Sequence, residues 1–118
     1  MQALRFSAAV EIGTGLVILA GPGIVVPLLL GVEVTGTAEL LARLFGFALL
    51  CLGLACWPER GVVGTPPFRT MLLYNAAIAM LLIYLAVIEH YWGALLVPAA
   101  VLHIAVAVWM SISRRKGF

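Results

Sequence analysis

Four long apolar stretches, separated by short polar or proline- and glycine-rich breaks, dominate the pattern of the chain. A helix needs about 20 mainly apolar residues to cross a bilayer, whereas the strands of membrane barrels are shorter and alternate in polarity. The uniformly apolar stretches therefore predict an all-α fold, an integral membrane four-helix bundle that forms a single domain over residues 1–118. The predicted spans cover about residues 4–20, 38–57, 68–90 and 92–113.

The breaks between the stretches predict the connections. Residues 21–36 start with Gly21-Pro22-Gly23 and are too short to cross a membrane alone, so we expect an interfacial or half-embedded loop or short helix. A re-entrant ligand loop is the alternative. Only a few residues around 89–93 are available to connect the last two spans, which predicts a tight antiparallel hairpin. Pro98 lies inside the predicted fourth span and should kink it.

The composition narrows the class of protein. Hydrophobic residues make up 64% of the 118 residues and charged residues only 10%, and the mean hydropathy is +1.18. A soluble domain of this size leaves too much surface exposed to hide so many apolar groups. A soluble enzyme, a nucleic-acid-binding protein and a disordered chain are therefore excluded. The net charge of +2 also gives no reason to expect a nucleic-acid partner.

The basic residues predict the orientation in the membrane. If the helices alternate in direction, six of the seven Lys and Arg residues lie on one side, and the opposite side has only Glu33, Glu39 and Glu89 near its edge. Because cytoplasmic loops are rich in Lys and Arg, both the N and C termini should be cytoplasmic. Glu11 interrupts the first stretch, so we expect a retained helix and not a cleaved signal peptide. The six basic residues are Arg5, Arg60, Arg69, Arg114, Arg115 and Lys116.

Three predicted spans carry polar residues at depth. Ser7, Glu11 and Thr14 follow an i, i+4, i+7 spacing, which places them on one helix face. Asn75 lies in the third span and His103 in the fourth. Glu11, Asn75 and His103 should lie about 9 to 15 Å from the cytoplasmic ends of their helices. Polar side chains in a bilayer normally face the bundle interior, so we predict one ligand or proton site made by Glu11, Thr14, Asn75 and His103.

Each residue of this predicted site also has a structural interpretation. Glu11 could be a neutral acid hydrogen-bonded to Asn75 or His103, or instead a proton site, a cation site or a ligand anchor. His103 could be a hydrogen-bonded interior histidine, a proton relay or a haem ligand. The second histidine, His90, should lie about 16 Å higher, too far to share an iron, so no cofactor is expected. Tyr74 is adjacent to Asn75 and should point elsewhere.

A second polar pair is predicted nearer the other side of the membrane. Glu39 and Arg43 stand in the favourable acid-before-base order at i, i+4. They belong to a seam that continues through Gly46 and Gly53, so Arg43 should face inward. Tyr84 at similar height makes an outer polar layer plausible. The pair is either a stabilising ion pair or a site for an anionic headgroup or carboxylate.

The four spans carry short pieces that resemble a known class. These are Val-Glu-Ile-Gly-Thr-Gly-Leu at 10–16, Leu-Gly-Leu-Ala-Cys-Trp-Pro at 52–58, Leu-Tyr-Asn at 73–75 and Pro-Ala-Ala-Val-Leu-His at 98–103. The chain resembles small four-helix bacterial inner-membrane proteins of unassigned function, and its layout is similar to that of DoxX-like proteins. The resemblance implies a multi-pass protein of the bacterial inner (cytoplasmic) membrane. The acid in the first helix is also similar to that of small multidrug-resistance transporters, but the other helices depart from that pattern.

Three functional hypotheses follow. The preferred one is a non-enzymatic oligomeric or accessory membrane component, with membrane lipid and copies of itself or a larger complex as partners. Its polar pocket would bind a small lipophilic or protonatable ligand. The second is a proton-coupled transporter or channel that works as a homodimer, with Glu11 as the coupling acid. The third is an intramembrane enzyme for a lipid or terpenoid, with Glu11 or His103 as acid-base. No zinc, phosphate-loop or nucleophile-elbow motif is present in the sequence.

Overall fold

The computed structural model describes residues 2–58 and 65–115, and all regular structure in these two segments is helical. Four of the five helices are long and apolar enough to cross a membrane. The all-α fold and the number of candidate spans are thus confirmed. The helices are α1 (Gln2–Ala20), α2 (Pro22–Leu30), α3 (Thr37–Ala55), α4 (Thr65–Val87) and α5 (Leu96–Arg115).

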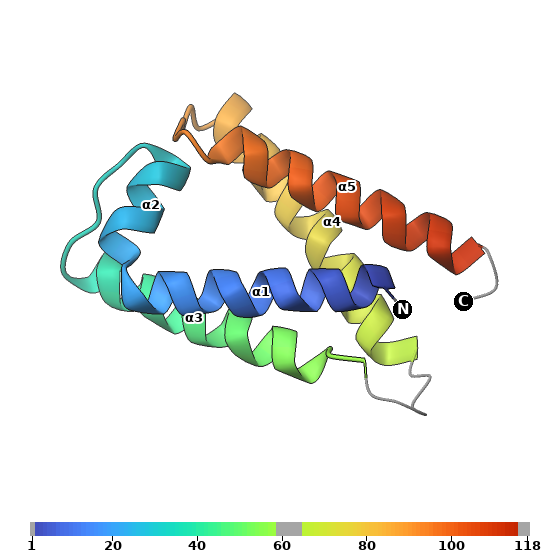
Figure 1. The fold of residues 1–118 in the computed structure, drawn as a ribbon. Coiled ribbons are helices and arrows are strands. Elements are labelled where there is room, and N and C mark those ends of the chain that lie inside the picture. Colours follow the sequence, from blue (N-terminus) through green and yellow to red (C-terminus); the bar gives the residue numbers. More distant parts are fainter. Residues whose placement is uncertain (1, 59–64, 116–118) are drawn as a thin grey trace.

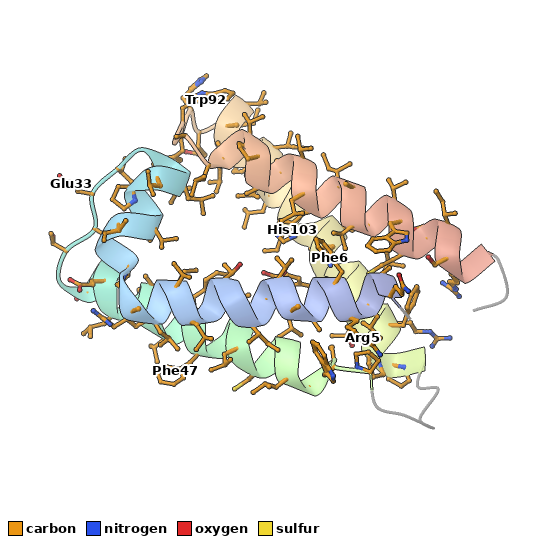
Figure 2. All side chains as sticks on the ribbon, viewed as in Figure 1. Arg5, Phe6, Glu33, Phe47, Trp92 and His103 are labelled. Carbon is orange, nitrogen blue, oxygen red and sulfur yellow. The ribbon has the colours of Figure 1, made fainter. Side chains whose placement is uncertain are left out.

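The outer surface of the long helices is apolar. Leu73 and Met80 on α4 are 71% and 70% exposed. Phe47 points from α3 away from α1 (Figure 2), and Val101 and Val108 on α5 are likewise exposed. Contiguous apolar surface of this extent is unfavourable in water and suits a hydrocarbon environment.

The long helices form two hairpins arranged as a wedge (Figure 1). Helices α1 and α3 pack along each other, and α4 and α5 form the second pair. The two hairpins converge at the end that carries both termini and separate toward α2. At the converging end Leu4 of α1, Met71 of α4 and Met110 of α5 share one buried apolar cluster. The Phe6 and Trp109 rings meet there, with centroids 5.9 Å apart.

Glycines allow α1 and α3 to approach closely. A Cβ added to Gly15 would lie 2.6 Å from the carbonyl oxygen of Gly46. A Cβ added to Gly53 would lie 2.7 Å from the carbonyl oxygen of Ala8. Small residues that bring two helix backbones together are typical of helix interfaces in membranes. The predicted seam is therefore confirmed at Gly46 and Gly53.

Helix α2 bridges the two hairpins at the wide end of the wedge. It follows α1 after one residue and ends at Gly31, whose φ of 73° is a left-handed conformation that glycine adopts without strain. The Leu95 amide, just before α5, donates to the Leu28 carbonyl oxygen at 2.7 Å. A Cβ on Gly93 would lie 2.2 Å from that same oxygen. The segment 21–36 thus contains a short helix whose end is fastened to the α4–α5 connection.

This contact gives a prediction for Gly93. An added Cβ would lie 2.2 to 2.5 Å from three backbone atoms of Leu28 and Leu29, so Gly93→Ala should push α2 away from the α4–α5 connection. The free energy of unfolding should fall by about 1 kcal/mol, the low end for overpacking, because α2 is a short helix that can shift as a unit. The Leu95 amide should then exchange its hydrogen faster, as hydrogen–deuterium exchange would measure. Gly23→Ala on α2 is the matched control, since a Cβ there meets nothing within 4 Å. Equal exchange in both variants would contradict the bridging role of α2.

Pro98 does not kink the last helix, so that expectation is wrong. Helix α5 begins at Leu96, four residues later than the predicted span, and Pro98 lies in its first turn. The first i to i−4 bond there runs from the Ala99 amide to the Leu95 carbonyl, at 2.9 Å. A proline in the first turn removes no helical hydrogen bond.

Exposed charged residues lie at both ends of the wedge. Arg5 lies at the converging end and Glu33 lies on the connection after α2 at the wide end (Figure 2). Arg69 near the start of α4 and Arg114 near the end of α5 are exposed, as is Arg5. Arg60 and Lys116, which also entered the orientation argument, lie outside the described residues, and of Arg115 only the backbone is described.

Candidate functional site

A cavity of about 600 Å³ lies between the two hairpins and is lined by residues of all five helices. Most of its wall is aliphatic, with Leu29 from α2, Leu49 from α3 and Leu82 from α4 among the lining residues. The polar and titratable side chains on the wall are Glu11, Thr14, Tyr74 and His103. The cavity therefore combines a long apolar wall with a small polar region supplied by α1, α4 and α5.

Asn75 joins three helices beside this polar region. Its side chain is buried, with 1% of its surface exposed. The amide nitrogen donates to Ser7 Oγ of α1 and to the Met71 carbonyl oxygen, both at 2.8 Å. The amide oxygen lies 2.8 Å from His103 Nδ1 of α5. The predicted convergence of Asn75 and His103 is thus present in the structure, with Ser7 as the third member of a network.

The same bonds define the tautomer of His103. The Met71 carbonyl oxygen only accepts hydrogen bonds, so the Asn75 atom that faces it is the amide nitrogen. The Asn75 oxygen consequently faces His103, and since it only accepts, Nδ1 must carry the hydrogen. In a neutral ring, Nε2 then presents a lone pair. His103 is one of the residues that line the cavity. Figure 2 shows His103 on the side of α5 that faces α1.

Glu11 lacks a full set of partners. Its side chain is buried, with 1% exposed, and it lines the cavity together with Thr14. Oε1 has no hydrogen-bond partner among the described residues. The Tyr74 hydroxyl is the group that interacts with this carboxyl. A buried acceptor without a donor costs free energy, so this oxygen marks a place for a ligand or a proton.

The suggested hydrogen bond from Glu11 to Asn75 or His103 is not formed. The Asn75 nitrogen donates to Ser7 and Met71, and its oxygen accepts from His103. Glu11 and Thr14 share the cavity with His103 but stand outside this hydrogen-bonded network. The structure therefore brings Glu11, Thr14 and His103 to one cavity, whereas Asn75 does not line it and joins the site through its contact with His103. The four residues do not form one hydrogen-bonded cluster.

Tyr74 was missed by the sequence reasoning, and the expectation that it points elsewhere is wrong. It lines the cavity, interacts with Glu11, and packs its ring edge-on against His103 with centroids 5.9 Å apart. Neighbouring positions on a helix differ by about 100°. Even so, Tyr74 and Asn75 both reach α1 and α5. Tyr74 contacts Glu11 and His103, and Asn75 contacts Ser7 and His103. The sequence signal that could have identified Tyr74 is its position directly before Asn75, a polar residue predicted to be buried.

The outer pair lies apart from the cavity. Arg43 Nη2 and Glu39 Oε1 are 3.3 Å apart, and both side chains are about two-fifths exposed. Arg43 Nη1 also donates to the Leu19 carbonyl oxygen at the end of α1. Cations near a helix C-terminus satisfy its last carbonyls, so these contacts support a stabilising pair. Tyr84 does not join it, because its hydroxyl donates to Glu89 Oε1 at 2.9 Å.

The described part of the chain contains no group of three or more His, Cys, Asp or Glu side chains that could hold a metal ion. The fold and the cavity are those of a helical protein with four candidate membrane spans, compatible with a multi-pass membrane protein. The chain matches no protein-family model, no curated protein sequence and no solved structure.

Proposed function

We propose that the chain is a multi-pass protein of the bacterial inner membrane with both termini in the cytoplasm. The exposed Arg5, Arg69 and Arg114 support this orientation, because they lie near the helix ends at the side of the termini. A fluorescent protein fused to the C-terminus should therefore fluoresce, and a periplasm-dependent phosphatase fused there should be inactive. A non-fluorescent fusion together with an active phosphatase fusion would contradict this orientation.

In this membrane the protein binds a lipophilic ligand that has a polar head. The observation that carries the proposal is the cavity of about 600 Å³, whose lining is mainly apolar and includes Glu11, with its Oε1 atom lacking a hydrogen-bond partner among the described residues. Ligand pockets typically have volumes of about 300 to 1,000 Å³ and combine apolar walls with a few polar groups. The apolar body of a ligand would lie along the wall, and its head would supply the donor that Glu11 Oε1 lacks.

The lipid phase gives direct access to the cavity. Phe45 on α3 and Leu81 on α4 both line the cavity, yet they are 47% and 48% exposed. Helix α3 packs on α1 and α2, so little covers the space between it and α4. A lipophile can therefore enter sideways between these helices. At the converging end the buried Leu4, Met71 and Met110 close the path, which supports a binding site in preference to a transport route.

The protein would act as an oligomeric or accessory component. The exposed apolar faces of α3, α4 and α5 are available to lipid, to a second copy or to helices of a larger complex. The fold places no large loop outside the long helices between residues 2 and 58 or between 65 and 115. Binding inside the membrane is therefore the activity that this architecture supports best.

A cavity-filling variant tests the proposal. Ala42 on α3 lines the cavity, and Ala42→Phe should exclude the ligand. Ala48 on the same helix is exposed and does not line it, so Ala48→Phe is the matched control. Mass spectrometry of lipophiles that co-purify with the protein should show a bound species in the wild type and in Ala48→Phe, but not in Ala42→Phe. The same bound species in all three proteins would contradict the proposal.

A further inference from the structure

The polar region of the cavity is rich in hydrogen-bond acceptors. Glu11 Oε1 is buried and has no hydrogen-bond partner within the described segments 2–58 and 65–115. His103 Nε2 has a free lone pair in the neutral ring, because the Asn75 oxygen holds the hydrogen on Nδ1. Glu11 belongs to α1 and His103 to α5, and both residues line the same cavity.

Most donors nearby are already engaged, and the Thr14 hydroxyl, which also lines the cavity, can either donate or accept. Both hydrogens of the Asn75 amide are used by Ser7 and Met71, and the Tyr74 hydroxyl interacts with Glu11. No Lys or Arg side chain is among the described residues that line the cavity. An anionic head, such as a fatty-acid carboxylate, would meet Glu11 without a cation to neutralise it, which is unfavourable in an apolar environment.

From this asymmetry we infer that the ligand is a single-chain lipophile with a primary ammonium head, whose N–H groups donate to Glu11 Oε1 and His103 Nε2. This inference rests on the proposed function and specifies the ligand class of the same cavity. A primary ammonium group has three N–H donors. Two of them donate to Glu11 Oε1 and His103 Nε2, and the third is left for the Tyr74 oxygen. The positive charge offsets the cost of an ionised Glu11 carboxyl, and the chain lies along the aliphatic wall that leads to α2.

A competition between matched probes tests the inference. Dodecylamine and dodecyltrimethylammonium have the same chain and the same charge, but only dodecylamine has N–H donors. An equimolar mixture is added to the purified full chain, and native mass spectrometry compares the two complexes. Hydrogen bonds to charged groups are worth enough to give a preference of about tenfold or more for dodecylamine. Dodecanol and laurate, added in separate competitions, should bind more weakly than dodecylamine.

Variants connect the preference to Glu11. Glu11→Gln should lose most of the preference for dodecylamine, because the amide presents a weaker, uncharged acceptor. Glu33→Gln is the matched control, since Glu33 is exposed on the connection after α2 and does not line the cavity. If Glu11→Gln does not fold, the wild-type competition still decides the question.

The outcomes separate this inference from the proposed function. Equal binding of both cationic probes, with binding blocked by Ala42→Phe, would overturn the ammonium head and keep the lipophile site. Stronger binding of laurate or dodecanol would also overturn the ammonium head. Failure of all four probes to bind, together with the absence of any co-purified lipophile, would overturn both.

Discussion

Gly15→Ala is expected to lower the free energy of unfolding by about 3 kcal/mol, at the upper end for overpacking. The added methyl group would lie 2.6 Å from the Gly46 carbonyl oxygen and 2.8 Å from the Leu50 amide nitrogen. Both are backbone atoms, so no flexible side chain can move aside. Helices α1 and α3 must separate, and the contact between Gly53 and Ala8 further along the interface weakens with it.

The measurement is thermal or denaturant unfolding in detergent micelles, followed by circular dichroism. Gly13→Ala is the control, because Gly13 lies on the same helix and a Cβ there meets nothing within 4 Å. Its effect should be neutral or slightly stabilising, because alanine is favoured over glycine inside a helix by about 0.5 to 1 kcal/mol. Similar destabilisation by both variants would contradict the α1–α3 contact as the cause of the loss.

Asn75→Leu is expected to lower the free energy of unfolding by about 2 kcal/mol, since hydrogen bonds inside membranes are individually modest but Asn75 makes three. The substitution keeps the number and branching of the side-chain heavy atoms, so the lost hydrogen bonds are the main cause. It removes the bonds to Ser7, Met71 and His103. The His103 N–H is left without an acceptor, and α1, α4 and α5 lose their shared polar contact.

The same unfolding experiment measures this effect, with Ser111→Ala as the control. Ser111 is exposed and donates to a carbonyl of its own helix, Ala107, at 2.8 Å. It should therefore contribute little. Asn75→Leu should also weaken dodecylamine binding, because the tautomer of His103 is no longer fixed. Unchanged stability and unchanged binding in Asn75→Leu would contradict the role assigned to the network.

The sequence predicts the helices and their closest contacts well, because these depend on local patterns. Apolar stretches of the required length predict the four candidate spans. The spacing of Gly46 and Gly53 predicts which face of α3 packs on α1. The burial of Asn75 and its contact with His103 follow from the high cost of leaving polar groups in an apolar environment.

The cavity could not be predicted from the same patterns. Leu82, which lines the cavity, and Leu73, which is 71% exposed, are the same residue type on one apolar helix. Hydrophobicity therefore does not distinguish a wall of the cavity from the outer surface. The separation of the hairpins depends on how α2 is fastened at Gly31 and Gly93, through backbone contacts that no residue pattern indicates. The position of Tyr74 on the cavity wall follows from the separation of the two hairpins.

The nitrogen-15 NMR spectrum of the histidine rings tests the central claim most directly. In the protein without ligand, His103 should have a protonated Nδ1 and an unprotonated Nε2. Addition of dodecylamine should shift the Nε2 resonance, while His90, which is exposed near the α4–α5 connection, should not respond. A His90→Gln variant assigns the signals. A protonated Nε2 in the free protein, or an Nε2 resonance that ignores saturating dodecylamine, would contradict the site described here.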